Sequence, residues 1–159
     1  MLSRRVPRRR LGAWSRLSIV VDGVATLLGV LGDRWALQVV REVSLGVRRF
    51  DEVQAATGAP RGVLADRLRR LTAAGILTVR PYRVPGRRGR QEYVLTAAGL
   101  DLVPVLAALS DWADRHLGGG AHEVIYRHGG CGGRLSATLR CECGEHAGPR
   151  DRLVAEVNR

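Results

Sequence analysis

The apolar positions near the start of the chain predict two consecutive helices. Residues 20–31 are almost entirely apolar and have helical length, and Gly32 is placed to end that helix. Asp33 then suits the N-cap of a second helix over residues 34–45, because its carboxylate can accept the first backbone N–H groups. The buried side of this second helix is expected to carry Trp35, Val39, Val40 and Val43.

Beyond Gly46, the pattern predicts a short extended link and then two helices separated by a tight turn. The link covers residues 48–50, with Phe50 in the core, and the second of the two helices covers about residues 60–74. Pro60 suits a first helical turn, where a missing N–H costs nothing, and Gly75 suits the position just past the helix end. One face of this helix is expected to point into the core through Leu64, Leu68 and Leu71.

The opposite face of that helix is small, polar and cationic. It carries, at its centre and on its flanks, Arg61, Gly62, Ala65, Asp66, Arg69 and Arg70. Such a face allows close approach to base edges and phosphates. An ordinary solvated helix face has a similar composition, so this helix alone leaves both interpretations open.

A cationic hairpin after the helix favours DNA binding. Residues 76–83 and 91–95 have the Val, Ile and Tyr content of strands, and the turn between them contains one proline and two glycines. Two helices followed by a hairpin predict a winged helix-turn-helix, which places one helix in the major groove and the hairpin, about residues 84–90, on the backbone or minor groove. The candidate DNA contacts are Arg48, Arg49, Arg61, Gly62, Ala65, Asp66, Arg69, Arg70, Arg83, Arg87, Arg88 and Arg90.

A further helical segment over residues 96–117 carries a long apolar stripe. Thr96 suits its N-cap, and Pro104 should kink or split it. The stripe exceeds what one small core needs, so we expect a homodimer seam made together with the first helix; packing on the chain's own domain is the alternative. The expected interface residues are Leu100, Val103, Leu106, Leu109, Trp112, Ala113, His116 and Leu117.

A tail of different character follows the glycines at 118–120. Residues 124–126 and 135–139 are expected as short strands, and all three cysteines lie here. Zinc ribbons use two knuckles, each with a pair of ligands followed by glycine; the pattern His-x2-Cys-Gly fits the first knuckle, and Cys-x-Cys-Gly provides the second pair. The four expected ligands of one structural zinc are His128, Cys131, Cys141 and Cys143, and His146 is a substitute.

Three interpretations of this tail remain open. A ribbon this small has almost no core, which favours a metal to fold around. The second pair, however, is one residue shorter than the usual Cys-x2-Cys, as expected of a vestigial hairpin that has lost its metal. A thiol switch among Cys131, Cys141 and Cys143 is the third interpretation, and no other cofactor is indicated.

The charge balance indicates a polyanionic partner. The chain has 159 residues with 26 cationic side chains against 15 acidic ones, a net charge of +11, and every cation is arginine. A GC-rich genome explains the absence of lysine but not the excess of positive charge. Residues 1–16 form a basic arm, which either follows the DNA backbone or is a solvated tail.

Together these patterns predict a mainly α, α+β protein in three parts: residues 1–16, 17–117 and 118–159. No apolar run reaches the length of a membrane span. An N-terminal basic stretch followed by apolar residues suggests a signal peptide, but Asp22 interrupts it and no convincing cleavage position follows. We therefore expect a cytoplasmic protein with no membrane partner, whose cysteines are reduced, metal-bound or redox-active.

Three stretches resemble the HxlR family of bacterial and archaeal transcription regulators, relatives of the MarR group. They read LGDRWALQVVREVSLGVRRFDEV, GAPRGVLADRLRRLTAAGIL and GRRGRQEYVLTAAGLDLVPVLAALSDWADRHL. The resemblance covers about residues 20–117 and implies a dimeric winged-helix repressor or activator without enzymatic activity. Many similar proteins carry a sensing cysteine in the first helix where this chain has Asp22, so an N-terminal thiol switch is excluded and other effector sensing stays open.

Two other classes of function compete with DNA binding. An RNA-binding or ribosome-associated zinc-ribbon protein would share the charge and the tail, but RNA modules often stack bases on aromatic side chains, and these make up only 4% of this chain. An enzyme is disfavoured because no nucleophile–base pair, phosphate loop or carboxylate pair occurs at a recognisable spacing.

Overall fold

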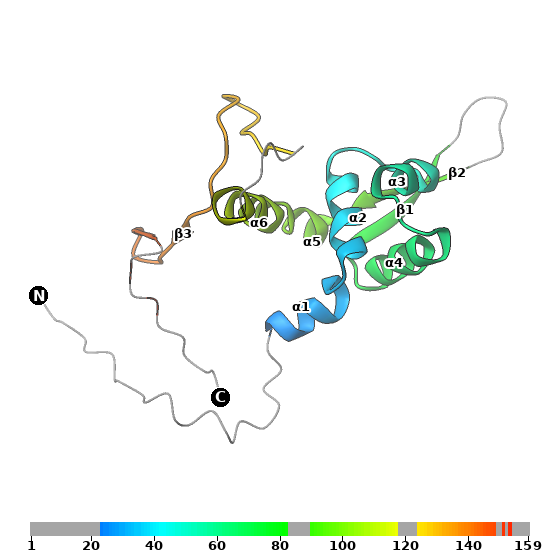
Figure 1. The fold of residues 1–159 in the computed structure, drawn as a ribbon, viewed down its shortest axis with the longest axis horizontal. Coiled ribbons are helices and arrows are strands. Elements are labelled where there is room, and N and C mark those ends of the chain that lie inside the picture. The colour runs from blue at the N-terminus through cyan, green and yellow to red at the C-terminus, as the bar shows by residue number, and fades with distance from the viewer. Residues whose placement is uncertain (1–22, 83–89, 118–123, 149–150, 152, 154–159) are drawn as a thin grey trace, which may run out of the picture.

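Six helices and two small antiparallel sheets make up the part of the chain that the structure describes. The computed structural model describes residues 23–82, 90–117, 124–148, 151 and 153. The helices are α1 (Gly23–Leu31), α2 (Arg34–Ser44), α3 (Phe50–Thr57), α4 (Arg61–Ala73), α5 (Ala97–Leu100) and α6 (Val103–His116), and the strands are β1 (Leu77–Tyr82), β2 (Arg90–Leu95), β3 (Leu139–Arg140) and β4 (His146–Ala147). The fold is mainly α, with α6 extending away from a winged-helix body (Figure 1).

The core lies where α2, α3, α4 and β1 meet. The apolar residues of each helix recur every three or four positions, so they line one face, and that face is buried. The largest fully buried side chains are Val39, Val40, Val53, Leu64, Leu68, Leu71 and Leu77. The prediction that three leucines of α4 point inward is confirmed.

α2 begins where the sequence predicts. Oδ1 of Asp33 accepts the N–H groups of Trp35 and Ala36 at 3.0 and 3.1 Å, which caps the helix. The expected link, however, ends one residue early: Phe50 is the first residue of α3 and is only partly buried against the core. The helix starts there because Glu52 accepts the backbone N–H of Arg49, at 3.3 Å.

β1 and β2 pair along their whole length and form the wing sheet. Leu77 lies opposite Leu95 at the base, and Tyr82 lies opposite Arg90 at the outer end. Arg90 is therefore the first residue of a strand and not part of the predicted tip, because its backbone still pairs across the hairpin. Arg83, at the end of the first predicted strand, and the remainder of the predicted tip, with Arg87 and Arg88, lie outside the described residues.

The link before α3 joins this sheet at its edge. Arg49 forms an isolated bridge with Glu92, and the N–H of Tyr93 donates to the carbonyl of Arg48 at 2.8 Å. The link thus holds the wing against the helix-turn-helix that follows it.

The segment after the wing is split in two, as the proline predicts. Oγ1 of Thr96 accepts the N–H of Gly99 at 3.1 Å and caps α5. The chain then turns, and α6 begins with Pro104 in its first turn, where a proline costs no hydrogen bond.

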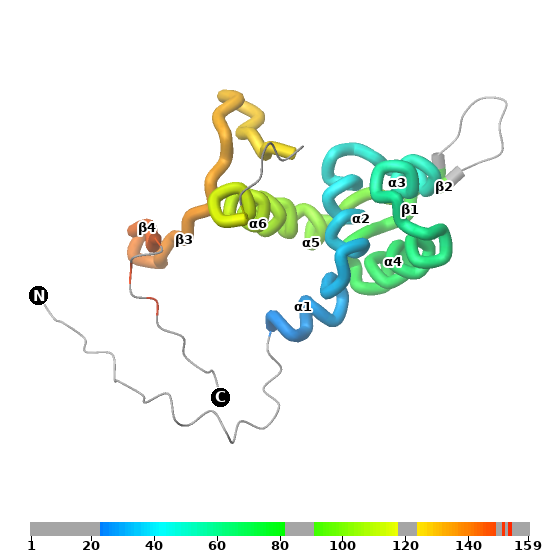
Figure 2. Tube along the Cα trace, in the orientation of Figure 1, coloured from blue at the N-terminus to red at the C-terminus, as the bar shows by residue number. Residues whose placement is uncertain are grey.

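The tail forms two tight turns instead of the strands expected at 124–126 and 135–139. A single bridge joins Arg127 to Arg134, and only Leu139 of the expected residues lies in a strand. The strand prediction was wrong because the tail offers no larger sheet to join, so its backbone pairs only beside the turns. Figure 2 shows the tail passing the end of α6, with the first turn on one side and the β3–β4 hairpin on the other.

Candidate nucleic-acid interface

A three-residue turn sets the angle between α3 and α4. Gly58 adopts a left-handed φ of 68°, and its N–H donates to the carbonyl of Gln54 at 2.9 Å. Oγ1 of Thr57 accepts the N–H of Ala59 at 3.3 Å, and Ala59 is buried. Pro60 follows as the N-cap of α4. The turn therefore directs the first turn of α4 into solvent.

The face of α4 that the sequence predicts to meet DNA is exposed along its length. Its exposed members are Arg61, Gly62, Ala65, Arg69 and Arg70, while Asp66 is partly exposed. Small residues lie between the arginines, so the helix backbone itself can approach a groove.

Arg61, the first residue of α4, is tethered loosely to α3. Its Nη1 lies 3.7 Å from Oδ1 of Asp51, and its guanidinium lies 4.8 Å from the centre of the Phe50 ring. Both charged side chains are highly exposed, so the ion pair is weak and the guanidinium can turn towards a phosphate or a base.

Asp66 lies at the centre of the same face and binds two neighbouring arginines. Arg69, one turn further on, and the adjacent Arg67 both form ion pairs with its carboxylate. The hydrogen bond from Arg69 holds the pKa of Asp66 below its usual value, and the positive charges of both arginines act in the same direction. The carboxylate is therefore ionised at neutral pH and positions Arg69.

Two arginines of α4 connect the helix to the body instead of pointing at a ligand. Nε of Arg67 lies 2.6 Å from Oδ2 of Asp33, and Nη2 of Arg70 donates to the carbonyl of Gly29 in α1 at 2.6 Å. Sequence reasoning missed Arg67 and gave Arg70 only a DNA role. No local pattern carries this information, because each partner lies far away in the chain.

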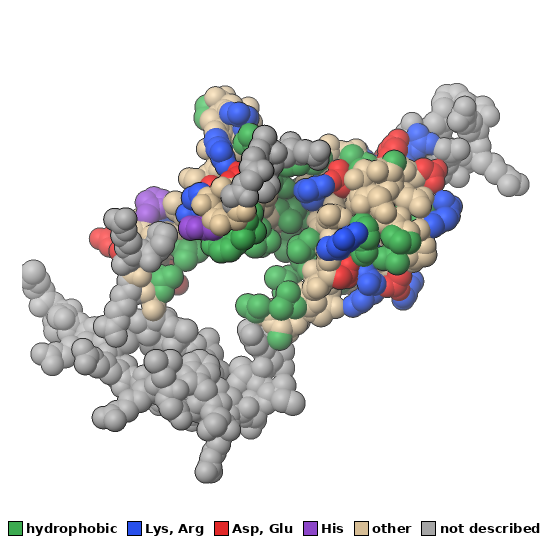
Figure 3. Space-filling model, in the orientation of Figure 1, with side chains coloured by type: hydrophobic (Ala, Val, Ile, Leu, Met, Phe, Trp, Pro, Cys, Tyr) green, Lys and Arg blue, Asp and Glu red, His purple; other side chains and the backbone are tan. Residues whose placement is uncertain are grey.

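The wing and its link contribute further cations. Arg48 is exposed and Arg49 is partly exposed. Arg80, on β1, is also exposed, and it was not among the predicted contacts. The sequence did contain a signal for Arg80: side chains alternate between the two faces of a strand, so a cation in the wing strand can point outward. Figure 3 shows basic and acidic side chains spread over the winged-helix body.

A second exposed surface is apolar and runs along α6 and α1. On α6 it comprises Val105, Leu109 and Trp112, which are 43%, 51% and 51% exposed, and the ring of His116 lies 5.2 Å from that of Trp112. On α1 it comprises Val24, Leu27 and Leu28. Figure 3 shows hydrophobic side chains gathered on α1 and along the edge of α6 that faces it.

The predicted dimer stripe needs two corrections on this surface. Leu106 is only 8% exposed and belongs to the chain's own core, so it is not available to a partner. Leu100 is exposed but lies on α5, separated from α6 by a turn. The stripe is therefore not continuous, because the break before Pro104 changes which side chains face outward.

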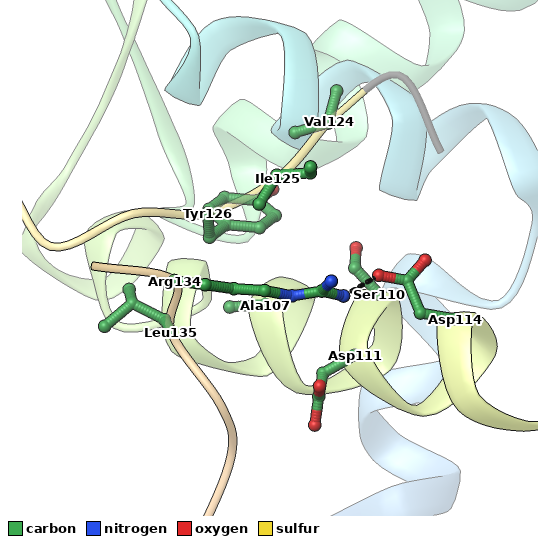
Figure 4. Close-up of a pocket in the computed structure, with 9 residues that line it drawn as sticks. All are labelled: Ala107, Ser110, Asp111, Asp114, Val124, Ile125, Tyr126, Arg134 and Leu135. Carbon is green, nitrogen blue, oxygen red and sulfur yellow. Dashed lines mark hydrogen bonds and ion pairs between the residues drawn. The ribbon is translucent and has the colours of Figure 1, made fainter. Parts of the chain in front are cut away.

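One cavity beside α6 is very small. It lies between α6 and the tail and has a volume of about 10 Å³, roughly the room one water needs. Figure 4 shows Arg134 of the tail reaching along it to an ion pair with Asp114 of α6, beside Tyr126. Burial raises the pKa of Tyr126 more than the nearby Ser44 and Arg41 lower it. These contacts attach the tail to the body.

The structure keeps the four expected zinc ligands in two separate pairs. His128 and Cys131 share the first turn, and Cys141 and Cys143 share the second, on the other side of the α6 end (Figure 2). No three His, Cys, Asp or Glu side chains converge on a metal position within the described ranges. The backbone N–H of Cys143 lowers the pKa of the Cys141 thiol by hydrogen bonding to it.

The turn, the exposed face of α4 and the paired strands after it define a winged helix-turn-helix protein. The chain belongs to the HxlR-like helix-turn-helix family, whose model matches residues 30–120. It is 36% identical over 132 residues to the uncharacterized HTH-type transcriptional regulator Rv3095 of Mycobacterium tuberculosis, a match that covers 82% of each chain. The family resemblance is confirmed, and the protein is a transcriptional regulator and not an enzyme.

Solved structures agree with this assignment. The chain is 28% identical to PA1607, a proposed transcription factor, with a TM-score of 0.74 over 87% of this chain and 97% of that one. It is 26% identical to the redox regulator HypR in its reduced form, with a TM-score of 0.54 over 60% of this chain and 94% of HypR. The match to PA1607 covers 87% of this chain, whereas residues 1–117 make up less than three quarters of it. This match therefore includes part of the tail. Among the described residues, no helix is both long and apolar enough to cross a membrane.

Proposed function

We propose that the protein binds double-stranded DNA as a homodimer and recognises a pseudo-palindromic operator. In this proposal α4 enters the major groove, and the wing lies on the adjacent backbone or minor groove. The observation that carries it is the exposed face of α4, where Arg61, Ala65, Asp66 and Arg69 lie in a row behind a fixed turn.

The arginines of α4 make different contacts, and this supports base recognition by only a few of them. Arg67 and Arg70 are bound to Asp33 and to α1, so they hold the helix in place. Arg61 and Arg69 reach outward, and arginine is the side chain that most often pairs with guanine in the major groove. Asp66 orients Arg69 through their ion pair and in doing so limits its conformations.

The apolar surface on α6 and α1 supports the homodimer. Its large side chains are about half exposed in the single chain, which is costly unless they meet another surface. A twofold partner would cover the same residues on both chains and place the two copies of α4 about 34–36 Å apart, one turn of DNA. The predicted members that are exposed beside this surface are Leu109, Trp112 and His116 of α6, together with Leu117 directly after it.

The relatives give no support to the alternative of an RNA-binding protein, since their names describe transcription regulators. A cytoplasmic location, where a DNA-binding regulator meets its operator, belongs to the same proposal. The genes whose operators the protein binds should also indicate the chemical class of any small-molecule effector.

Genome-wide footprinting of the bound protein tests the proposal. It should recover one motif whose two half-sites are related by a twofold axis and spaced by about one helical turn. Arg69→Ala should abolish the enrichment of the motif but leave the protein folded. Recovery of RNA instead of DNA, or of DNA without any shared motif, would contradict the proposal.

A further inference from the structure

The first turn of the tail is built around two candidate metal ligands. The carbonyl of His128 accepts the N–H of Gly132 at 2.8 Å, and the N–H of His128 donates to the carbonyl of Gly133 at 2.8 Å. Cys131 lies directly before these glycines. The backbone therefore closes on itself and presents both side chains from one turn.

The second turn repeats the same hydrogen bonds with one residue fewer. The carbonyl of Cys141 accepts the N–H of Gly144 at 2.8 Å, and the N–H of Cys141 donates to the carbonyl of Glu145 at 2.8 Å. Cys143 again lies directly before the glycine. The short spacing of this pair thus fits the same turn and does not disrupt it.

The glycine after the second ligand is required in both turns. Gly132 and Gly144 have φ values of 70° and 93°, a region that other residues rarely adopt. The left-handed glycine lets the chain reverse directly after the second candidate ligand of each turn. Two turns with the same hydrogen-bond pattern in one short tail indicate a common function.

The two side chains of the first turn already face each other through a hydrogen bond. Nδ1 of His128 lies 3.3 Å from Sγ of Cys131. A tetrahedral zinc ion, with bonds of about 2.0–2.3 Å, holds nitrogen and sulfur ligands roughly 3.5 Å apart. Gly130 leaves the space that the imidazole occupies, since a Cβ there would lie 3.1 Å from the ring.

The tail has no core that would otherwise hold the turns. Every residue from 127 to 146 is exposed, including Leu135 at 42% and Leu139 at 60%. Such small segments depend on metal bonds for their fold, because they bury too little apolar surface. The first turn is attached to α6 through Arg134 and Asp114, which gives the second turn a fixed point to close on.

We propose that one zinc ion binds His128, Cys131, Cys141 and Cys143 and draws the two turns together into a closed ribbon beside the end of α6. Each turn supplies two ligands and a structural zinc site needs four, so neither turn suffices alone. Three thiolates and an imidazole select zinc over magnesium or calcium. The exposed residues between the two turns change conformation when zinc binds, and the winged helix does not.

Cobalt substitution of the full-length protein tests this site. After removal of metal with a chelator, CoCl2 should bind at one ion per chain and give the visible bands of tetrahedral cobalt together with thiolate charge-transfer bands. ZnCl2 should abolish both sets of bands at one equivalent. Cys131→Ser, Cys143→Ser and His128→Asn should each lose the tetrahedral spectrum, and the matched control His146→Asn should retain it.

The winged helix provides an internal check on folding. Helical circular dichroism should be the same in every variant, because the tail contributes no residue to the helices of the core. Zinc-free protein with three freely reactive thiols, two ions per chain, or one ion shared by two chains would overturn the proposal. So would a tetrahedral spectrum that survives in Cys131→Ser or Cys143→Ser. None of these results depends on whether the protein binds DNA.

Discussion

Arg67 of α4 is bound to Asp33 at the start of α2. Nε of Arg67 lies 2.6 Å from Oδ2 of Asp33, and the other carboxylate oxygen caps α2. The two side chains are 21% and 32% exposed, so water screens this pair less than a surface pair. One carboxylate therefore fixes both the beginning of α2 and the position of the recognition helix.

Replacing this carboxylate should destabilise the protein. Asp33→Ala removes a helix cap and leaves Arg67 without its partner, so we expect the free energy of unfolding to fall by about 2–4 kcal/mol. Urea denaturation followed by circular dichroism measures the change. The control is Asp51→Ala, whose pair with Arg61 is exposed, and it should cost less than about 0.5 kcal/mol. Equal losses in the two variants would contradict the structural role of Asp33.

Neutralising Asp66 should strengthen binding to random-sequence DNA. The Asp66→Asn variant removes a negative charge from the proposed interface and releases Arg69, so the salt dependence should steepen by about one unit. Titration of a random duplex at several salt concentrations measures this slope. The control is Asp101→Asn, an exposed carboxylate at the α5–α6 turn. An unchanged affinity and slope would show that this face of α4 does not meet phosphate.

The pH dependence of the wild type follows from the ion pair between Asp66 and Arg69. Because Arg69 lowers the pKa of Asp66, the carboxylate remains ionised until the pH falls below its usual titration range. Its contribution to stability is present above that range and is lost only as the pH falls through the lowered pKa. Asp66→Asn should therefore raise random-duplex affinity equally at pH 6 and pH 8. A difference that disappears at pH 6 would contradict this assignment.

Arginines of the helix and of the wing should respond differently to substitution. Arg69→Ala should cost about 1–3 kcal/mol on the operator and far less on a scrambled duplex, because it removes a base contact. Arg88→Ala should weaken both duplexes about equally and lower the salt slope by about one unit. Binding over a salt series distinguishes them. The opposite pattern would exchange the two roles, and no effect of either change would exclude helix and wing as the DNA surface.

The apolar surface predicts the oligomeric state. Light scattering at micromolar concentration should give about twice the mass of the 17.3 kDa chain. Leu109→Asp should yield a monomer, because it places a charge at the centre of the buried seam. The control Leu45→Asp, at a site equally exposed after the end of α2, should remain dimeric. A monomeric wild type, or dissociation by both substitutions, would contradict the proposed seam.

The sequence by itself determined the helix-turn-helix and its core. The leucines of α4 recur at helical spacing, and Asp33, Pro60 and Gly75 mark helix ends through local backbone chemistry. The wing strands follow from their β-branched and aromatic residues, and the split at Pro104 follows from its missing N–H. Each of these signals acts over a few residues, so a single sequence carries it completely.

The tertiary structure alone decided what the arginines and the outer helices face. Arg70 contacts a carbonyl 41 positions away, and Leu106 is taken up by the chain's own core, although spacing placed it on the dimer stripe. The tail strands were misplaced because a strand needs a neighbouring strand, which the sequence of the tail does not reveal. Partners distant in the chain are chosen by packing and by which charges meet, and periodicity describes only the face that a residue occupies on its own helix.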